Sequence, residues 1–141
     1  MIISVAKANI QKPIEEVFAY LEALDNQTEY NSSVKSAKKR EGALEYEISI
    51  DLGFFSMKEV YRVIEKRLPH LLLCRCEGKS MAFEDEYLLE SNGNSTDIQI
   101  TDKMELKGLL SWSEPIAHPI LKSQMQDNLN RLKSILESRP Q

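Results

Sequence analysis

Hydrophobic and polar residues alternate along the middle of the chain, across residues 34–107. In the clearest segment, residues 44–52, every second residue is apolar, and the residues between are glutamate, serine or aspartate. A period of two residues is typical of a strand that buries one of its faces. The same reasoning predicts further strands at Ile2–Ile10 and at residues 57–66, 71–76, 81–90 and 97–106.

Short segments rich in turn-forming residues separate these strands. They are Gly53-Phe54, Leu68-Pro69-His70, Gly78-Lys79 and Asn92-Gly93-Asn94. The last segment is typical of a tight hairpin, in which the two flanking strands pair antiparallel around a very short loop. The alternating region therefore predicts an antiparallel sheet.

Two segments follow a helical period instead. Near the N-terminus, Ile14, Val17, Phe18, Leu21 and Leu24 share one helical face, Pro13 suits the first helical position, and a short second helix is expected to reach about Tyr30. After Gly108 the period is helical again, with Pro115 and Pro119 in the first turns of a helix that ends near Glu137. Its length of about two dozen residues gives roughly 35 Å. One stripe of that helix contains Leu121, Met125, Asn128, Leu129, Leu132, Ile135 and Leu136.

The predicted order is one strand, two helices, six strands and a long helix, which places the chain in the α+β class. A length of 141 residues with 42% hydrophobic residues fits a single domain, 1–141, with one core. The net charge is −4, and the densest basic run is Lys38-Lys39-Arg40, which we interpret as a solvated strand end. A nucleic-acid partner is therefore not expected, because phosphate contacts need a concentrated cationic face. The sequence does not fix the oligomeric state.

The chain shows no apolar run long enough to cross a bilayer and no pattern typical of a signal peptide, so the expected location is the cytoplasm. Cys74 and Cys76 would share one face of a strand, where a disulfide between them has poor geometry, and we expect two buried, reduced thiols. His70 and His118 are isolated from each other and from the cysteines. No metal site and no cofactor motif is predicted.

Several segments resemble one known family. They are residues 13–21 with Asn26 and Tyr30, Pro69 before Leu71, Asp85-Glu86-Tyr87, and residues 128–133. Together they are similar to the START-like superfamily, also called SRPBCC, and within it to the polyketide cyclase/dehydrase branch. The resemblance covers essentially the whole chain, although Tyr30 stands where many relatives have tryptophan.

The resemblance implies a helix-grip fold, in which a curved seven-stranded antiparallel sheet surrounds the long C-terminal helix and leaves a cavity between them. Members of the superfamily include lipid carriers, hormone receptors, aromatase/cyclases and chaperone activators, so the fold alone does not select a function.

Two acidic residues share the phase of apolar neighbours. Asp85 lies between Phe83 and Tyr87, and Asp102 lies between Ile100 and Met104. A hairpin with a two-residue loop at Gly93-Asn94 would place Asp85 opposite Asp102, with their Cβ atoms about 5 Å apart. One of two carboxyl groups so close should have a raised pKa, and the pair would titrate as a unit and could act as an acid and a base. Alternatively, the strands bulge, or Arg62 or Arg75 neutralises both acids.

The predicted function is the binding of a small hydrophobic or aromatic molecule in an internal cavity of a few hundred Å³. The inward face of the strand at residues 57–66 stays open, since Tyr61 and Glu59 favour one phase and Val60 and Ile64 the other. The predicted ligand-binding residues are Tyr46, Ile48, Ile50, Tyr61, Phe83, Tyr87, Ile98, Ile100, Met104 and Met125.

Two other functions remain open at this stage. The first is a cyclase or dehydratase type of enzyme that uses Asp85 and Asp102, and whether the chain catalyses any reaction is not decided. The second is an interaction module similar to chaperone activators, which predicts a filled core and an exposed apolar patch. Leu109, Leu110 and Trp112 are the candidate patch, although packing of these residues under the start of the long helix is favoured.

Overall fold

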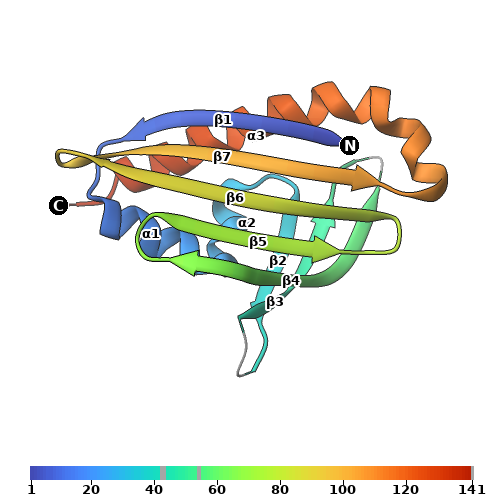
Figure 1. Ribbon diagram of the computed structural model, residues 1–141, viewed down its shortest axis with the longest axis horizontal. Helices are drawn as coiled ribbons and strands as arrows, with labels where there is room; N and C mark the ends of the chain where they lie inside the picture. The colour runs from blue at the N-terminus through green and yellow to red at the C-terminus, as the bar shows by residue number, and fades with distance from the viewer. Residues whose placement is uncertain (42–43, 54, 141) are drawn as a thin grey trace.

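A computed structural model describes residues 1–41, 44–53 and 55–140. Within these residues, seven strands form one antiparallel sheet in the order β1-β7-β6-β5-β4-β3-β2 (Figure 1). The strands are β1 (Ile2–Ile10), β2 (Val34–Lys39), β3 (Glu45–Asp51), β4 (Ser56–Arg67), β5 (Leu71–Glu77), β6 (Met81–Asn92) and β7 (Ser95–Leu106). The helices are α1 (Ile14–Glu22), α2 (Gln27–Tyr30) and α3 (Glu114–Glu137), and short 3₁₀ helices cover Leu24–Asn26 (η1) and Gly108–Ser113 (η2).

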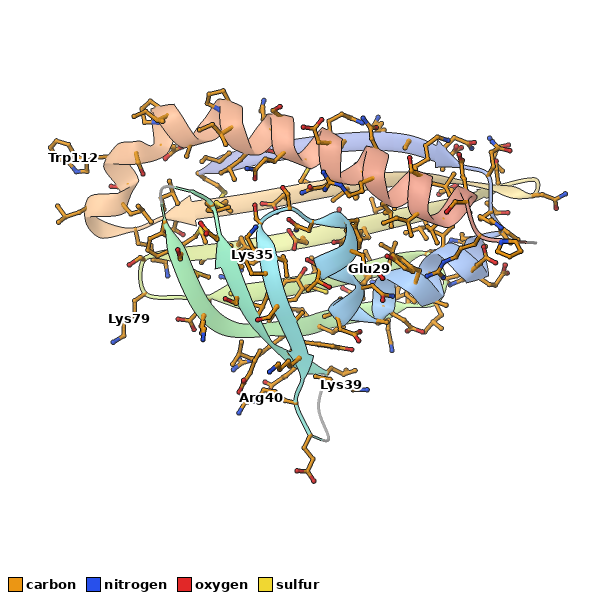
Figure 2. All side chains as sticks on the ribbon, turned by 180° about the vertical axis from the view of Figure 1, so that it is seen from behind. Glu29, Lys35, Lys39, Arg40, Lys79 and Trp112 are labelled. Carbon is orange, nitrogen blue, oxygen red and sulfur yellow. The ribbon has the colours of Figure 1, made fainter. Side chains whose placement is uncertain are left out.

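The predicted α+β class and order of elements are confirmed, as is the curved sheet with its long C-terminal helix. Figure 1 shows α3 running alongside β1 and β7, with α1 near the C-terminal end of α3. Lys38, Lys39 and Arg40 are exposed where β2 ends, as expected, and Figure 2 shows Lys39 and Arg40 at the tip that extends away from α3. No helix in the described part of the chain is long and apolar enough to span a membrane.

The C-terminal half of α3 packs closely against the rest of the protein. Leu129, Leu132 and Leu136 are completely buried, because their spacing of three and four residues keeps them on one helical face. Two lysines add polar contacts at this end. Lys12 Nζ donates to the carbonyl oxygen of Arg139 at 2.7 Å, and Lys133 Nζ donates to that of Asn9.

The turn between β6 and β7 sets the register of the two strands. Asn92 pairs with Ser95, so Gly93 and Asn94 form the predicted two-residue loop, and Gly93 takes the positive φ of 63° that such loops require. Tyr87 consequently pairs with Ile100, as the sequence predicts. The turn predicted at Gly53-Phe54 is described only at Gly53, which also has a positive φ of 89°, because Phe54 lies outside the described residues.

The structure decides the phase of β4 that the sequence left open. Tyr61 is buried and Glu59 is half-buried, so the odd-numbered residues face the interior. The pairing with β5 shifts between Val63 and Glu65, and Ile64 at this bulge is 53% exposed. Ile64, whose apolar side chain favoured the other phase, is therefore not buried. Leu44, predicted to begin the preceding strand, lies before β3 and is exposed.

Candidate functional site

A cavity lies between the inner face of the sheet and α3, with α2 at its side. Its atom-free space, counted out to the solvent at its opening, is about 810 Å³. The walls come from β1, β2, β3, β6, β7, α2 and α3 and from the segments that flank α2 and β3. They are lined by Ile2, Ser4, Gln27, Tyr30, Asn31, Ser33, Val34, Ile50, Leu52, Phe83, Asp85, Tyr87, Ile100, Asp102, Met104, Leu121, Gln124, Met125, Asn128 and Leu129.

The cavity interior is narrower than the sequence-based expectation of a few hundred Å³. The space that the centres of water-sized molecules can occupy is about 90 Å³, enough for several waters.

Most of the residues predicted to bind a ligand do lie at the cavity. Six of the ten line it, namely Ile50, Phe83, Tyr87, Ile100, Met104 and Met125, together with both predicted acids, Asp85 and Asp102. Whether these residues bind a ligand stays a prediction.

The other four predicted residues, Tyr46, Ile48, Tyr61 and Ile98, are buried but do not line the cavity. The alternation of a strand identifies its inward face but not which part of that face is covered by a helix. Here α1 packs against β6 and β7, and the backbone of Leu24 in η1 hydrogen-bonds with Tyr46.

Asp85 and Asp102 are direct partners across β6 and β7, in the register that the hairpin predicts. Asp85 is buried, and Asp102 is half-buried because it borders the open space of the cavity. The pKa of Asp102 lies well above the usual aspartate value, mainly because burial disfavours the charged form, and further because of the charge of Asp85 and a hydrogen bond with it. We call these two residues the carboxyl pair. The pair holds a shared proton more tightly than a solvated carboxyl group does.

Tyr61 provides the polar partner of the carboxyl pair. Its hydroxyl group donates a hydrogen bond to Asp85 Oδ2. Gln27 Nε2 in turn donates to the hydroxyl oxygen of Tyr61 at 3.1 Å and approaches that of Tyr87 at 3.4 Å. The Tyr87 and Tyr30 hydroxyl oxygens are also 3.4 Å apart. We call Gln27, Tyr30, Tyr61 and Tyr87 the hydroxyl network; with the carboxyl pair it forms a connected polar cluster in an apolar wall.

Burial raises the pKa of every tyrosine in the hydroxyl network, so these hydroxyl groups stay protonated and act as hydrogen-bond donors at neutral pH. Cys74, which pairs with Asp85 across β5 and β6, has a pKa raised to about 12 by burial and then by the charge of Asp85. It is a free, buried thiol, as expected, and not a thiolate nucleophile.

Neither arginine considered in the sequence analysis neutralises the carboxyl pair. Arg62 Nε forms an ion pair with Glu45 at 2.8 Å, and Arg75 Nη1 forms one with Glu84 at 2.8 Å, both on the outer face of the sheet. Among the described residues that line the cavity, none carries a basic side chain. Nor do the described residues contain a group of three histidine, cysteine or acidic side chains placed to hold a metal ion.

The polar residues contributed by the helices were not predicted as site residues. Gln27 of α2 lies inside although glutamine is usually exposed, and Gln124 of α3 accepts a hydrogen bond from Ser33 Oγ at 2.9 Å. Asn128 was predicted on the buried stripe of α3 but not as part of a site; its amide donates to Asn31 Oδ1 at 3.2 Å. The only sequence signal for such residues is a polar side chain in phase with a buried helical face.

The start of the long helix differs from the prediction that Leu109 and Trp112 pack beneath it. Leu109 is 90% exposed and Trp112 is 85% exposed, and only Leu110 is partly buried. Figure 2 shows the Trp112 side chain pointing away from the rest of the molecule. The 3₁₀ helix η2 follows directly on β7 and lies past the end of that strand (Figure 1).

Comparisons with known proteins agree with this architecture. The sequence model of the family described as polyketide cyclase/dehydrase and lipid transport matches residues 1–137. No curated protein matches the chain. A solved structure from Deinococcus radiodurans has a TM-score of 0.76 at 12% identity, and the alignment covers 97% of this chain and 98% of that one.

Two further structures are similar to this chain. A START superfamily protein from Mycobacterium smegmatis has a TM-score of 0.70 at 14% identity, covering 97% of this chain and 95% of that one. The Zhui aromatase/cyclase from a Streptomyces strain has a TM-score of 0.75 at 11% identity, with 97% and 94% covered. At these identities the structural likeness establishes the fold alone.

Proposed function

The chain belongs to the polyketide cyclase/dehydrase and lipid transport family, and on that basis we propose that it binds a small apolar or aromatic molecule in the cavity between its sheet and α3. The observation that carries the proposal is the cavity itself. It combines walls of isoleucine, leucine, methionine and aromatic side chains with one buried polar cluster, which is the usual composition of a site for a small organic ligand. The apolar walls would hold the body of the ligand and the polar cluster would orient it.

Phenylethanol, a neutral aromatic alcohol, is a suitable first probe because one ring suits the narrow interior. Added to isotope-labelled protein, it should cause saturable NMR shifts at cavity residues such as Ser4, Gln27 and Gln124. Met104→Trp should weaken this binding at least about tenfold, since the larger ring would occupy the cavity. Ile64→Trp places the same ring on the outer face, where the native side chain is 53% exposed, and should leave binding unchanged.

Shifts confined to residues outside the cavity, or equal binding by the two tryptophan variants, would contradict the proposal. Circular dichroism of both variants checks that they fold.

The carboxyl pair supports a second candidate function, proton transfer to and from a bound carbonyl compound, as a cyclase or dehydratase requires. Two neighbouring carboxyl groups in one cavity, of which Asp102 has a raised pKa, can serve as the acid and the base. In this reading the ionised member takes a proton from the carbon next to a carbonyl group, and the protonated member donates to the carbonyl oxygen.

Acetophenone tests the second candidate, because removal of a methyl proton in deuterium oxide exchanges it for deuterium. Catalysis predicts exchange faster than in buffer alone and loss of that acceleration in Asp85→Asn, with binding retained. Exchange at the buffer rate when the protein is saturated with acetophenone would leave binding as the function.

A further inference from the structure

We infer that the ligand of this cavity carries a protonated amine on an apolar or aromatic body and that the amine binds at the Asp85–Asp102 pair. The inference rests on the proposed function and adds the chemical class of the ligand. It starts from the charge of the cavity, in which the carboxyl pair supplies both ionisable acids and no lining residue in the described chain supplies a base.

Within the described part of the chain, no basic side chain forms an ion pair with either carboxyl group or lines the cavity. Their neighbours on other strands are neutral at pH 7: Ser4 on β1 pairs with Asp102, Cys74 on β5 pairs with Asp85, and Tyr61 on β4 donates to Asp85. The helix residues Gln27, Gln124 and Asn128 line the same cavity and add only neutral amides. A buried carboxylate without a cation is costly, and the shared proton relieves only part of that cost.

An ammonium group suits this environment for two physical reasons. It has three donors and no acceptor, and the two carboxyl groups have more acceptor sites than the hydrogen bond from Tyr61 and the bond between them occupy. The aromatic rings of Tyr30, Phe83 and Tyr87 also line the cavity, and the faces of aromatic rings attract ammonium groups. On binding, the ammonium group replaces the proton shared by the pair as the source of positive charge.

Other end groups fit less well. A ligand carboxylate would add a further negative charge beside the pair and force additional protonation. A hydroxyl group can accept or donate one hydrogen bond but leaves the charge of the pair uncompensated. The cavity is thus expected to reject fatty acids and other anionic amphiphiles.

Phenethylamine, phenylethanol and phenylacetate test the inference, since they share a benzene ring and a short linker and differ in the end group. In titration calorimetry near pH 7, phenethylamine should bind about tenfold or more tightly than either of the others. Its binding should also release protons, measured as a binding enthalpy that changes with the ionisation enthalpy of the buffer. Phenylethanol should release none.

A double variant, Asp85→Asn with Asp102→Asn, should lose the preference for the amine while still binding phenylethanol, which shows that it folds. Asp127→Asn removes an exposed negative charge from α3 and should keep the preference. The inference is wrong if phenethylamine binds no more tightly than phenylethanol, or if the double variant keeps the preference; the proposed function survives both results. If none of the three compounds binds, the proposed function itself fails. If the double variant does not fold, the proton release on phenethylamine binding to the native protein tests the inference instead, and no release would contradict it.

Discussion

Asp102 shows how one residue couples the site to the stability of the protein. Burial and Asp85 raise the pKa of Asp102 in the folded state, so the folded protein binds this proton more tightly than the unfolded chain does. The stabilisation that this bound proton gives the folded state is therefore complete below the ordinary aspartate pKa of about 4. It is lost as the pH rises through the raised pKa of Asp102.

We predict that Asp102→Asn is more stable than the native protein near pH 7, because the folded protein disfavours the ionised form of this carboxyl group and the neutral amide avoids that cost. The difference should shrink as the pH falls toward about 4, because the native carboxyl group is then neutral as well. Denaturant melts across this pH range provide the measurement, with Asp127→Asn as the control that should stay flat. An Asp102→Asn variant that is less stable than the native protein near pH 7 would contradict this account of the carboxyl pair.

Tyr61→Phe should lower the free energy of unfolding by about 1–3 kcal/mol, because it leaves a buried acceptor on Asp85 without its donor. Tyr87→Phe is the matched comparison, since the Tyr87 hydroxyl group makes only 3.4 Å contacts and should cost less than about 1 kcal/mol. Equal losses of unfolding free energy in the two variants would show that the hydrogen bond from Tyr61 to Asp85 stabilises the protein no more than the contacts of the Tyr87 hydroxyl group.

At the scale of single residues, the sequence predicts what depends on local register. The hairpin at Gly93-Asn94 is enough to place Asp85 opposite Asp102. The contact between Gln27 and Tyr61 is not predictable in this way, because it joins a short helix to a distant strand whose apolar pattern is ambiguous at Val60 and Ile64. Such contacts depend on tertiary packing rather than on the period of either segment.

The long helix has the predicted extent, but it is buried unevenly along its length. Its C-terminal half follows the apolar stripe, and Leu132 is completely buried. Its first turns carry comparable apolar residues, yet Ile116 is 68% exposed and Ile120 is 41% exposed. Helical periodicity identifies a face but cannot show where the sheet beneath that face ends. This is why Leu109 and Trp112 were wrongly expected to be covered.

We predict that Leu132→Ala lowers the free energy of unfolding by about 2–5 kcal/mol, the range for truncating a buried leucine. Trp112→Ala, in the exposed segment before α3, should change it by less than about 0.5 kcal/mol despite the larger loss of side chain. Denaturant melts of the two variants test whether the C-terminal half of α3 is buried while the segment before α3 is exposed. A large loss in Trp112→Ala, or a negligible one in Leu132→Ala, would show that the burial is distributed differently.

For the whole molecule, the alternating strands and the C-terminal helix are sufficient to predict the sheet, the order of its elements and an enclosed space. The size of that space is not predictable in the same way, because it depends on how far side chains such as Met104 and Met125 reach from opposite walls. The exposed Leu109 and Trp112 meet one condition for an interaction module, but the open cavity does not meet the other, a filled core.

The central claim is that a small aromatic ligand lies between the sheet and α3 with its polar end at the carboxyl pair. A crystal structure of the protein with the tightest-binding of the three phenyl compounds tests this claim most directly. The account predicts density for the ring among Phe83, Ile100 and Met104, and the polar end group within hydrogen-bond distance, about 3 Å, of Asp85 or Asp102. Density only at the exposed Leu109 and Trp112, with the cavity empty, would contradict it.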